Sequence, residues 1–303
     1  MPYRKADLQP ITEKELFSIH IKKTWNKFIL DVSFHLDFSG ITVLFGPSGA
    51  GKSTILRILS GLEIADEGKI SNGDELWFDK KNRIHRVPQE RSVGFVFQDY
   101  ALFPHMTVEK NVAYGIEEKE RLPEVKELLS LVRLSEYKDH YPNQLSGGQK
   151  QRVALIRALA RKPKLLLMDE PLSAVDWQTR RQLQEDLKKI IKRFQVTTLY
   201  VTHDMTEAYK LADHVLVLEA GKIVKRGIPE EVFMGKKLST RIQLAGKVVD
   251  IEYDAIMTAV TVFHADQYFK TLIDPEEIDR LNLRVGDDVV IGAKSSDVVL
   301  FKI

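Results

Sequence analysis

One octapeptide near the start of the chain constrains the fold more than any other feature. Residues Gly46 to Ser53 (Gly-Pro-Ser-Gly-Ala-Gly-Lys-Ser) fit the spacing G-x-x-x-x-G-K-[ST]. The turn follows a nearly continuous apolar run, residues 41–45, and precedes residues 52–62, whose apolar side chains recur at helical spacing. A short strand that is apolar on both faces is typical of a parallel sheet. The feature therefore predicts a strand, a glycine-rich turn and a helix in that order.

The following residues continue the alternation of strands and helices. Apolar and polar side chains alternate over residues 17–38, which indicates antiparallel strands with one exposed face. Helical periodicity dominates from about residue 108 to 160 and returns over 178–194. Buried strands are expected at 165–168, 197–202 and 215–218. This order predicts the α/β class, with a mostly parallel core sheet, an antiparallel β subdomain and a helical subdomain.

A change of composition at residues 235–240 predicts a linker. We therefore expect one domain over residues 1–235 and a second over 236–303. The pattern in the second domain is entirely β, which is typical of a small barrel or sandwich, and an all-β, OB-like barrel is expected. The expected strands are residues 247–253, 258–263, 268–273, 288–291 and 298–301.

The composition excludes several classes of protein. No cysteine is present, which excludes disulfides, Cys-ligated zinc, iron–sulfur clusters and thiol nucleophiles. A formal charge of +2 gives no electrostatic case for binding nucleic acid or an anionic membrane. No apolar run is long enough for a membrane helix, and the start of the chain lacks the apolar region of a secretory signal. We expect a cytoplasmic protein that reaches a membrane only through a partner.

The glycine-rich turn has the chemistry of a phosphate site. Glycines let backbone N–H groups surround phosphate oxygens without clashes from Cβ atoms, and the next helix points its positive end at the anion. Lys52 is placed to reach the β- and γ-phosphates of a nucleotide, and Ser53 to ligate Mg²⁺. The residues expected around the nucleotide are Gly46, Pro47, Ser48, Gly49, Ala50, Gly51, Lys52, Ser53 and Thr54.

A second strand supplies the acidic partner that a phosphate-bound Mg²⁺ needs. The apolar run 165–168 leads into Asp169 and Glu170, at the carboxyl end of the strand, where parallel sheets place their ligands. Asp169 would hold Mg²⁺ directly or through water, and Glu170 would polarise the attacking water. Alone, the pair would be better explained as an acidic turn after a strand. Together with the glycine-rich turn it indicates a site.

A third motif indicates which class of phosphate-binding protein the chain resembles. Residues 145–149 (Leu-Ser-Gly-Gly-Gln) are followed by Arg152 and an apolar helix. This resembles the signature motif of ABC-transporter ATPases, and companion motifs follow in family order: Gln98 after residues 94–97, residues 173–176 after the acidic pair, and His203 after a strand. The resemblance covers about residues 14 to 234 and is of the importer type. It implies an ATPase that binds ATP with Mg²⁺.

The resemblance also implies a role for each motif. The catalytic set would be Lys52, Gln98, Glu170 and His203, with Ser53, Gln98 and Asp169 around Mg²⁺. The signature motif opens a helix and would form a second anion cradle for the ATP of another copy, so the chain would act as a head-to-tail homodimer. The ATP contacts made across that dimer would come from Ser146, Gly147, Gly148, Gln149 and Asp176.

Further partners follow from the same resemblance. Transmembrane permease subunits would bind the chain at the inner face of the cell membrane, and a solute-binding protein would act indirectly. Residues 103–108 would lie partly in the core and partly on the docking surface, with Arg91, Asp99 and Tyr100 flanking the same groove. No nucleic-acid partner is expected.

The adenine of the nucleotide should stack on an aromatic side chain from the first strands. Trp25 is the first candidate and Phe28 the second. Packing in the core, or a place at a hairpin tip, would explain Trp25 equally well.

The end of the chain resembles the small oxyanion-binding Mop (molbindin) module, related to TOBE domains. The resemblance rests on residues 239–248, 283–289 and 294–300, although Ile242 stands where the family usually has asparagine. Donors for a tetrahedral dianion would be Ser239, Arg241, Lys294 and Ser296. A purely structural barrel that steadies the ATPase dimer is the alternative.

This fusion implies a molybdate importer, with tungstate chemically close. Other importer ATPases, for sulfate, iron, sugars or polyamines, have similar cassettes, and a structural or regulatory barrel would fit them as well. A soluble ABC ATPase of nucleic-acid repair or translation is a remote alternative, since neither a second cassette nor a coiled-coil insertion is present. In a third hypothesis, the tail itself is an oxyanion buffer or sensor.

Overall fold

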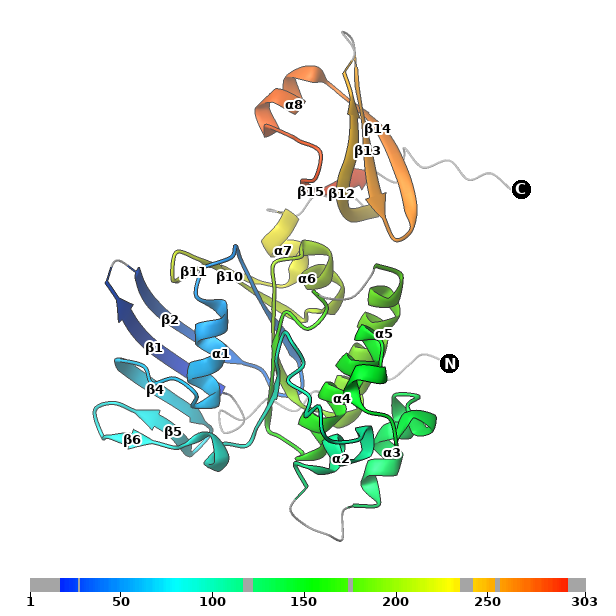
Figure 1. Cartoon of the computed structure of the whole chain (residues 1–303). Helices are drawn as coiled ribbons and strands as arrows, with labels where there is room; N and C mark the ends of the chain where they lie inside the picture. Colours follow the sequence, from blue (N-terminus) through cyan, green and yellow to red (C-terminus); the bar gives the residue numbers. More distant parts are fainter. Residues whose placement is uncertain are drawn as a thin grey trace, which may run out of the picture. The chain divides into compact units, whose positions relative to one another are not determined.

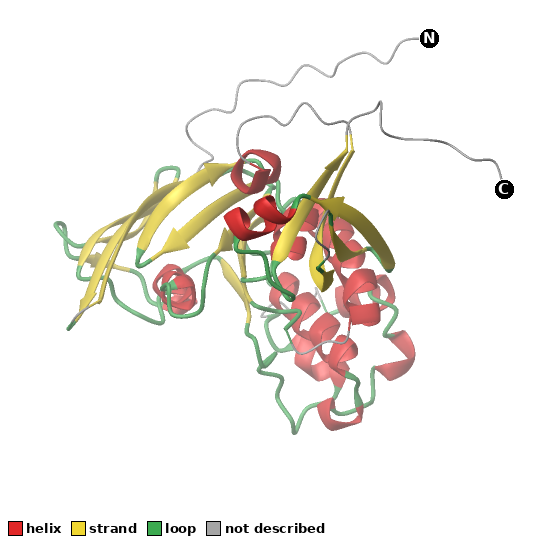
Figure 2. Cartoon of the chain, turned by 90° about the horizontal axis from the view of Figure 1, so that it is seen from above, coloured by secondary structure: helices red, strands yellow, loops and turns green. Residues whose placement is uncertain are grey.

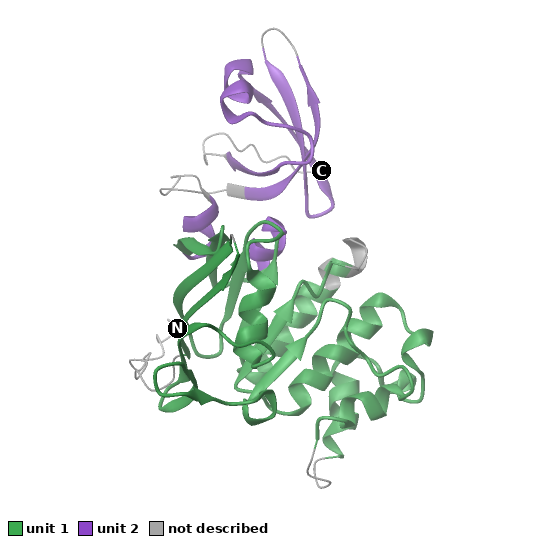
Figure 3. Cartoon of the chain, turned by 60° about the vertical axis from the view of Figure 1, so that its left-hand side comes forward, with its two compact units in different colours: residues 1–203, 211–226 green, residues 204–210, 227–303 purple. Residues whose placement is uncertain are grey.

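The computed structural model describes residues 17–26, 28–116, 122–173, 177–234, 242–253 and 257–293. The chain divides into two compact units, residues 1–203 with 211–226, and residues 204–210 with 227–303 (Figure 3). The domain boundary expected after residue 235 falls outside the described ranges and stays a prediction. Within those ranges no helix is both long enough and apolar enough to cross a membrane.

The first unit begins with an antiparallel sheet. Strands β1 (Phe17–Trp25) and β2 (Phe28–Leu36) pair along their whole length. The predicted alternation is confirmed, because Ile19 and Ile21 are buried on one face while His20 is exposed on the other. The sheet order is β2-β1-β4-β5-β6, where the last three strands are Glu67–Asn72, Glu75–Asp79 and Ile84–His85.

The second sheet of this unit is the mostly parallel one that the sequence predicted. Its order is β11-β10-β3-β9-β8-β7, and the five strands from β10 to β7 run parallel to their neighbours. A two-residue turn at Ala220 and Gly221, both with positive φ, returns the chain from β10 into β11. The strands are Ile41–Phe45 (β3), Val93–Val96 (β7), Leu165–Asp169 (β8), Thr197–Thr202 (β9), His214–Glu219 (β10) and Lys222–Gly227 (β11).

The core of the first unit lies between the two sheets. Helix α1 (Lys52–Ser60) buries Ile55, Leu56, Ile58 and Leu59 in one cluster with apolar side chains from both sheets. The helix begins in the glycine-rich turn, so this packing also anchors the turn. Fully burying one such aliphatic side chain stabilises the fold by about 1.5–3 kcal/mol.

The remaining helices of the first unit lie on the side of the core away from the antiparallel sheet (Figures 1 and 2). Helix α4 (Gly147–Ala160) packs on β7 and on its neighbours α2 (Val108–Ala113), α3 (Glu124–Leu131) and α5 (Trp177–Phe194). These helices confirm the predicted helical segments at 108–160 and 178–194.

The second unit holds a four-stranded antiparallel sheet of order β14-β13-β12-β15. Its apolar core is small and is formed by Val248, Val260, Val262 and Ile278. The strands are Ile242–Glu252 (β12), Thr258–His264 (β13), Gln267–Ile273 (β14) and Asp288–Ala293 (β15). Helices α6 (Met205–Leu211) and α7 (Pro229–Met234) precede them.

The expectation of an all-β second domain is wrong. Helix α8 (Pro275–Leu281) lies between β14 and β15 and buries Ile278. Asp274 caps its start by accepting the N–H of Glu276, and Asn282 ends it in the left-handed region. The four described strands form an open sheet with edges at β14 and β15, so the OB-like barrel stays a prediction. The strand expected at 298–301 lies outside the described residues.

Arg91 does not lie in the groove in which the sequence placed it. Its side chain is buried, and the guanidinium donates to Ile58 O and Leu59 O, both at 2.7 Å, and to Arg86 O at 3.0 Å. A cation thus caps the C-terminus of α1, where the helix dipole is negative. Desolvation lowers the pKa of Arg91 to about 10, so the group stays charged at neutral pH.

Replacing Arg91 with alanine is expected to lower the free energy of unfolding by about 2 kcal/mol, because carbonyls at the end of α1 lose charged donors in a buried place. Denaturant titration measures the change. The matched control is Arg86→Ala, which removes a half-exposed ion pair with Glu75 worth about 1 kcal/mol or less. Equal losses in the two variants would show that the cap has no special contribution.

Candidate functional site

The glycine-rich turn is shaped by positions that only glycine fits. Gly46 directly follows β3 and is buried, and a Cβ there would lie 2.2 Å from Leu218 O of β10. Gly49 and Gly51 have φ values of 79° and 104°, in the left-handed region that other residues rarely adopt. A Cβ on Gly51 would lie 3.4 Å from Phe28 Cζ, so β2 packs directly against the turn.

Lys52 is the first residue of α1 and is buried, with 5% of its surface exposed. Its ammonium donates to Gly46 O at 2.7 Å and to Pro47 O at 2.9 Å, and it lies 4.0 Å from Glu170 Oε1. Burial lowers the pKa of Lys52, while the charges of Glu170 and Asp169 act in the opposite direction. The turn therefore holds a desolvated cation where a polyphosphate chain would be neutralised.

Ser53 and Asp169 meet at the edge of the core sheet. The Ser53 hydroxyl donates to Asp169 Oδ1 at 3.1 Å. Adjacent oxygens around an octahedral Mg²⁺ are about 2.9 Å apart, since each metal–oxygen bond is about 2.0–2.1 Å. The pair therefore fits two neighbouring positions in a magnesium shell. The pKa of Asp169 lies above its usual value, mainly because burial desolvates the carboxylate. The charge of Glu170 raises this pKa further, and the hydrogen bond from Ser53 partly opposes the shift.

Glu170 is held in an uncommon backbone conformation beside this pair. Its φ is +41°, its N–H donates to Val201 O at 3.1 Å, and its carbonyl accepts the Ser173 hydroxyl at 2.8 Å. Its carboxylate is 3.1 Å from His203 Nδ1. The carboxylate lies between a lysine and a histidine, which is an arrangement that can hold and orient a water molecule.

Gln98 lies at the same edge of the sheet. Strand β7 pairs in parallel with β8 in the register Val96↔Met168, so the segment after β7 runs beside Asp169. Gln98 follows β7 by two residues and is exposed. The parallel order of the sheet thus gathers Lys52, Asp169, Glu170 and His203 from three separate segments, and it leads the segment with Gln98 to the same edge.

The signature motif occupies the start of α4. Ser146 is the N-cap residue, its hydroxyl accepts the N–H of Gln149 at 3.3 Å, and the Gln149 side chain accepts the N–H of Ser146 at 2.8 Å. Within the described chain these two side chains bond to each other's backbone and not to the glycine-rich turn. Gly147 is half-buried and Gly148 buried in the first turn of the helix. Asp176 lies outside the described residues, as do Ser239, Arg241, Lys294 and Ser296.

Both adenine candidates lie at the β1–β2 hairpin. Trp25 and Phe28 are partners in the strand register, and their ring centroids are 5.9 Å apart. Each ring is half-buried against the core, so part of its surface packs on the core and part is exposed and could stack on a base. Phe28 reaches Gly51, whereas Trp25 has Lys23 Nζ at 5.7 Å from its ring centroid.

Arg157 is a residue whose place the sequence did not indicate. Its guanidinium donates to Ala101 O at 2.7 Å and to Tyr100 O at 2.9 Å, and it lies 5.3 Å from the Phe103 ring centroid. Tyr100 and Ala101 have positive φ values, so Arg157 holds a strained loop after Gln98 onto α4. The one feature of the sequence that could have indicated its role is a basic residue within the apolar run of α4. Phe103 and Met106 are half-buried, and a docking role for residues 103–108 stays a prediction.

Comparisons with known proteins identify a family and several relatives that the chain resembles. A family model described as "ABC transporter" matches residues 29–173. The probable sulfate/thiosulfate import ATP-binding protein CysA of Chlorella vulgaris is 46% identical over 70% of this chain and 91% of its own length. The sulfate/thiosulfate import ATP-binding proteins of Halalkalibacterium halodurans and Agrobacterium fabrum are 44% and 47% identical, and the chain spans 61% and 63% of their lengths.

Two solved structures are similar to the chain. One is a dimeric structure of a post-hydrolysis state of the ATP-binding cassette MJ0796 bound to ADP and Pi. It has a TM-score of 0.57 and 28% identity, and the match covers 71% of this chain and 98% of the solved one. The other is a nucleotide-free ATP-binding cassette from an ABC transporter, with a TM-score of 0.62 and 27% identity, covering 72% and 92%.

Proposed function

Because this chain belongs to the family of ABC transporter ATP-binding proteins, we propose that it is the ATPase subunit of an importer for sulfate or thiosulfate. Proteins of this family bind ATP, generally with Mg²⁺, and hydrolyse it, and this chain is an ATPase of that kind. The observation that carries the assignment of the site is the convergence of Lys52, Ser53, Asp169 and Glu170 within hydrogen-bonding or ion-pair distance.

In the proposed nucleotide site, different residues bind the phosphates, the metal ion and the adenine. Residues 46–54 surround the phosphates, and Lys52 exchanges its two carbonyl contacts for the β- and γ-phosphates. Ser53, Asp169 and Gln98 would hold Mg²⁺, which would neutralise phosphate charge. Trp25 stacks on the adenine.

Hydrolysis depends on Glu170 and His203. Glu170 accepts a hydrogen bond from the water that attacks the γ-phosphate. It takes a proton from that water as the new bond to the γ-phosphorus forms and the bond from that phosphorus to the bridging oxygen of ADP breaks. His203 is 3.1 Å from the same carboxylate and is placed to hydrogen-bond both Glu170 and a γ-phosphate oxygen. Lys52 lies 4.0 Å from Glu170 Oε1, and this ion pair holds the carboxylate beside the phosphate-binding turn.

A second copy and a permease complete the proposed assembly. Ser146, Gly147, Gly148, Gln149 and Asp176 complete the ATP site of a second copy. The dimeric structure of the similar cassette MJ0796 supports this proposal. Ser146 is exposed at the helix start, where it is accessible to a partner. The dimer lies at the inner face of the cell membrane, bound to transmembrane subunits, and a solute-binding protein acts on them from the other side.

Sulfate is supported over the molybdate that the C-terminal resemblance favoured. The relatives described above carry sulfate/thiosulfate import in their names. The proposed oxyanion donors of the C-terminal region lie outside the described residues, and we propose a structural or regulatory role for that region. Molybdate remains the second candidate because sulfate and molybdate are both tetrahedral dianions.

Transport in proteoliposomes tests the solute. The full chain is reconstituted with the permease subunits and binding protein of its organism, and uptake of labelled sulfate is measured with ATP inside. Uptake is expected, with competition by thiosulfate and none by equimolar molybdate. Uptake of molybdate in preference to sulfate would reverse the assignment, and uptake of neither would require another solute. Calorimetry of the full chain with each oxyanion is expected to show no heat of binding.

A further inference from the structure

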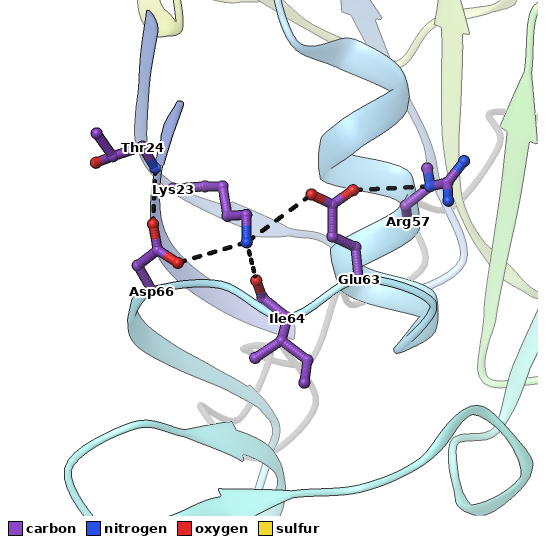
Figure 4. A network of polar contacts seen from close by, with 6 residues as sticks. All are labelled: Lys23, Thr24, Arg57, Glu63, Ile64 and Asp66. Atoms are coloured by element: carbon purple, nitrogen blue, oxygen red, sulfur yellow. Dashed lines mark hydrogen bonds and ion pairs between the residues drawn. The ribbon is translucent and has the colours of Figure 1, made fainter. Parts of the chain in front are cut away.

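A cluster of charges surrounds Lys23 in strand β1, beside the proposed adenine site (Figure 4). The Lys23 ammonium donates to Ile64 O at 2.8 Å and lies 3.4 Å from Asp66 Oδ1 and 4.0 Å from Glu63 Oε1. The side chain is 19% exposed, so these contacts replace most of its water. All three acceptors come from the loop between α1 and β4.

Asp66 fixes the backbone of β1 just before Trp25. Its Oδ2 accepts the N–H of Thr24 at 2.8 Å, and its own N–H donates to Lys22 O at 2.9 Å. The hydrogen bond from Thr24, followed by the charge of Lys23, holds the pKa of Asp66 below its usual range. The last residues of β1 are therefore tied on both sides of Lys23.

Glu63 connects the same cluster to the helix of the phosphate site. Glu63 Oε2 lies 3.7 Å from Arg57 Nε, and its N–H donates to Arg57 O at 3.1 Å. Arg57 is in the last turn of α1, the helix that begins at Lys52. The cluster thus links the strand that carries Trp25 to the helix that carries the phosphate-binding lysine.

Lys23 also touches the indole itself, with Nζ 5.7 Å from the ring centroid of Trp25. A cation within about 6 Å of a tryptophan ring is attracted to its face. Lys23 and Phe28, whose ring centroid lies 5.9 Å from that of Trp25, therefore both restrain the position of the indole.

We propose that Lys23 is a positioning residue for nucleotide recognition, which sets the Trp25 ring at a fixed distance from Lys52 so that purine and triphosphate bind together. The proposal rests on the proposed function, because it requires the adenine to stack on Trp25. Lys23 itself touches neither the phosphates nor the reacting atoms. Removal of the Lys23 side chain should therefore weaken the contribution of the adenine base to nucleotide affinity and leave the contribution of the phosphates unchanged.

The test compares Lys23→Met with the matched control Lys22→Met. Lys22 precedes it in β1 and forms an exposed ion pair with Glu67 at 3.1 Å. Affinities for MgATP and for magnesium tripolyphosphate, which has no base, are measured by calorimetry on the full chain. We expect Lys23→Met to weaken ATP binding about threefold to tenfold and to leave tripolyphosphate binding unchanged, as cation–π contacts of this size imply. Lys22→Met is expected to change neither affinity.

Further variants separate this proposal from the assignment of Trp25. Lys23→Arg should recover most of the ATP affinity, and Lys23→Met should have no added effect in a Trp25→Ala background. If Trp25→Ala weakens ATP binding but Lys23→Met does not, the proposal is overturned and the base site stands. Equal weakening of both ligands by Lys23→Met would also overturn it, because Lys23 would then act on the phosphate site. If Trp25→Ala changes nothing, the base site and the proposal both fail.

Discussion

Glu170→Gln is expected to reduce ATP hydrolysis by about 10²–10⁴-fold while MgATP binding persists, because the change removes a general base and keeps the shape of the side chain. The carboxylate contacts both His203, at 3.1 Å, and Lys52, at 4.0 Å. The amide of glutamine can still accept a hydrogen bond, but it cannot take a proton from water. With hydrolysis blocked, two copies that share ATP are expected to remain associated.

Steady-state phosphate release measures the rate, calorimetry measures ATP affinity, and gel filtration with MgATP measures the dimer. The matched control is Glu219→Gln at the exposed end of β10, which is expected to hydrolyse ATP normally. A Glu170→Gln variant with normal turnover would remove Glu170 from the role of base. If this variant instead fails to bind ATP, Glu170 would be assigned a role in binding the nucleotide before hydrolysis.

Gly46→Ala is expected to abolish measurable ATP binding and to lower the free energy of unfolding by about 3 kcal/mol. The new Cβ would lie 2.2 Å from Leu218 O, a backbone atom in the hydrogen-bonded strand β10. Overpacking of a rigid core costs about 1–3 kcal/mol and sometimes more. Because β10 cannot retreat without breaking the sheet, the turn must move, and Lys52 loses the position that its contact with Gly46 O defines.

Gly40→Ala is the matched control, because it lies at the opposite end of β3 and its new Cβ would have only an ordinary contact, 3.5 Å from Asp213 Oδ2. Thermal unfolding with and without MgATP compares the two variants. Gly40→Ala should keep the stabilisation by nucleotide and Gly46→Ala should lose it. Stabilisation by MgATP that persists in Gly46→Ala would contradict this prediction, because the turn would then accommodate a Cβ and still bind nucleotide.

The local pattern of apolar and polar residues predicted most of the helices and strands. Where the sequence-based predictions were wrong, the structure shows a physical cause. The buried strands and the amphipathic helices of the first unit were predicted because their periodicity follows from one-sided or two-sided burial. Helix α8 was missed although Asp274 and Pro275 are start signals, since its seven residues are too few for a clear helical period. Arg91 was placed in a docking groove by the family resemblance, yet it is buried, and carbonyls of α1 compensate the burial of its charge.

The sequence by itself determined the phosphate-binding turn, the acidic residues after an apolar strand and the order of the companion motifs. These features are local, because glycine conformations, strand ends and helix caps depend on neighbours along the chain. Only the tertiary structure decided that Ser53 meets Asp169, that Glu170 lies between Lys52 and His203, and that Lys23 joins β1 to the end of α1. These contacts depend on tertiary packing, which brings together residues far apart in the chain: Lys23 and Ile64 are 41 positions apart, and Ser53 and Asp169 are 116 positions apart.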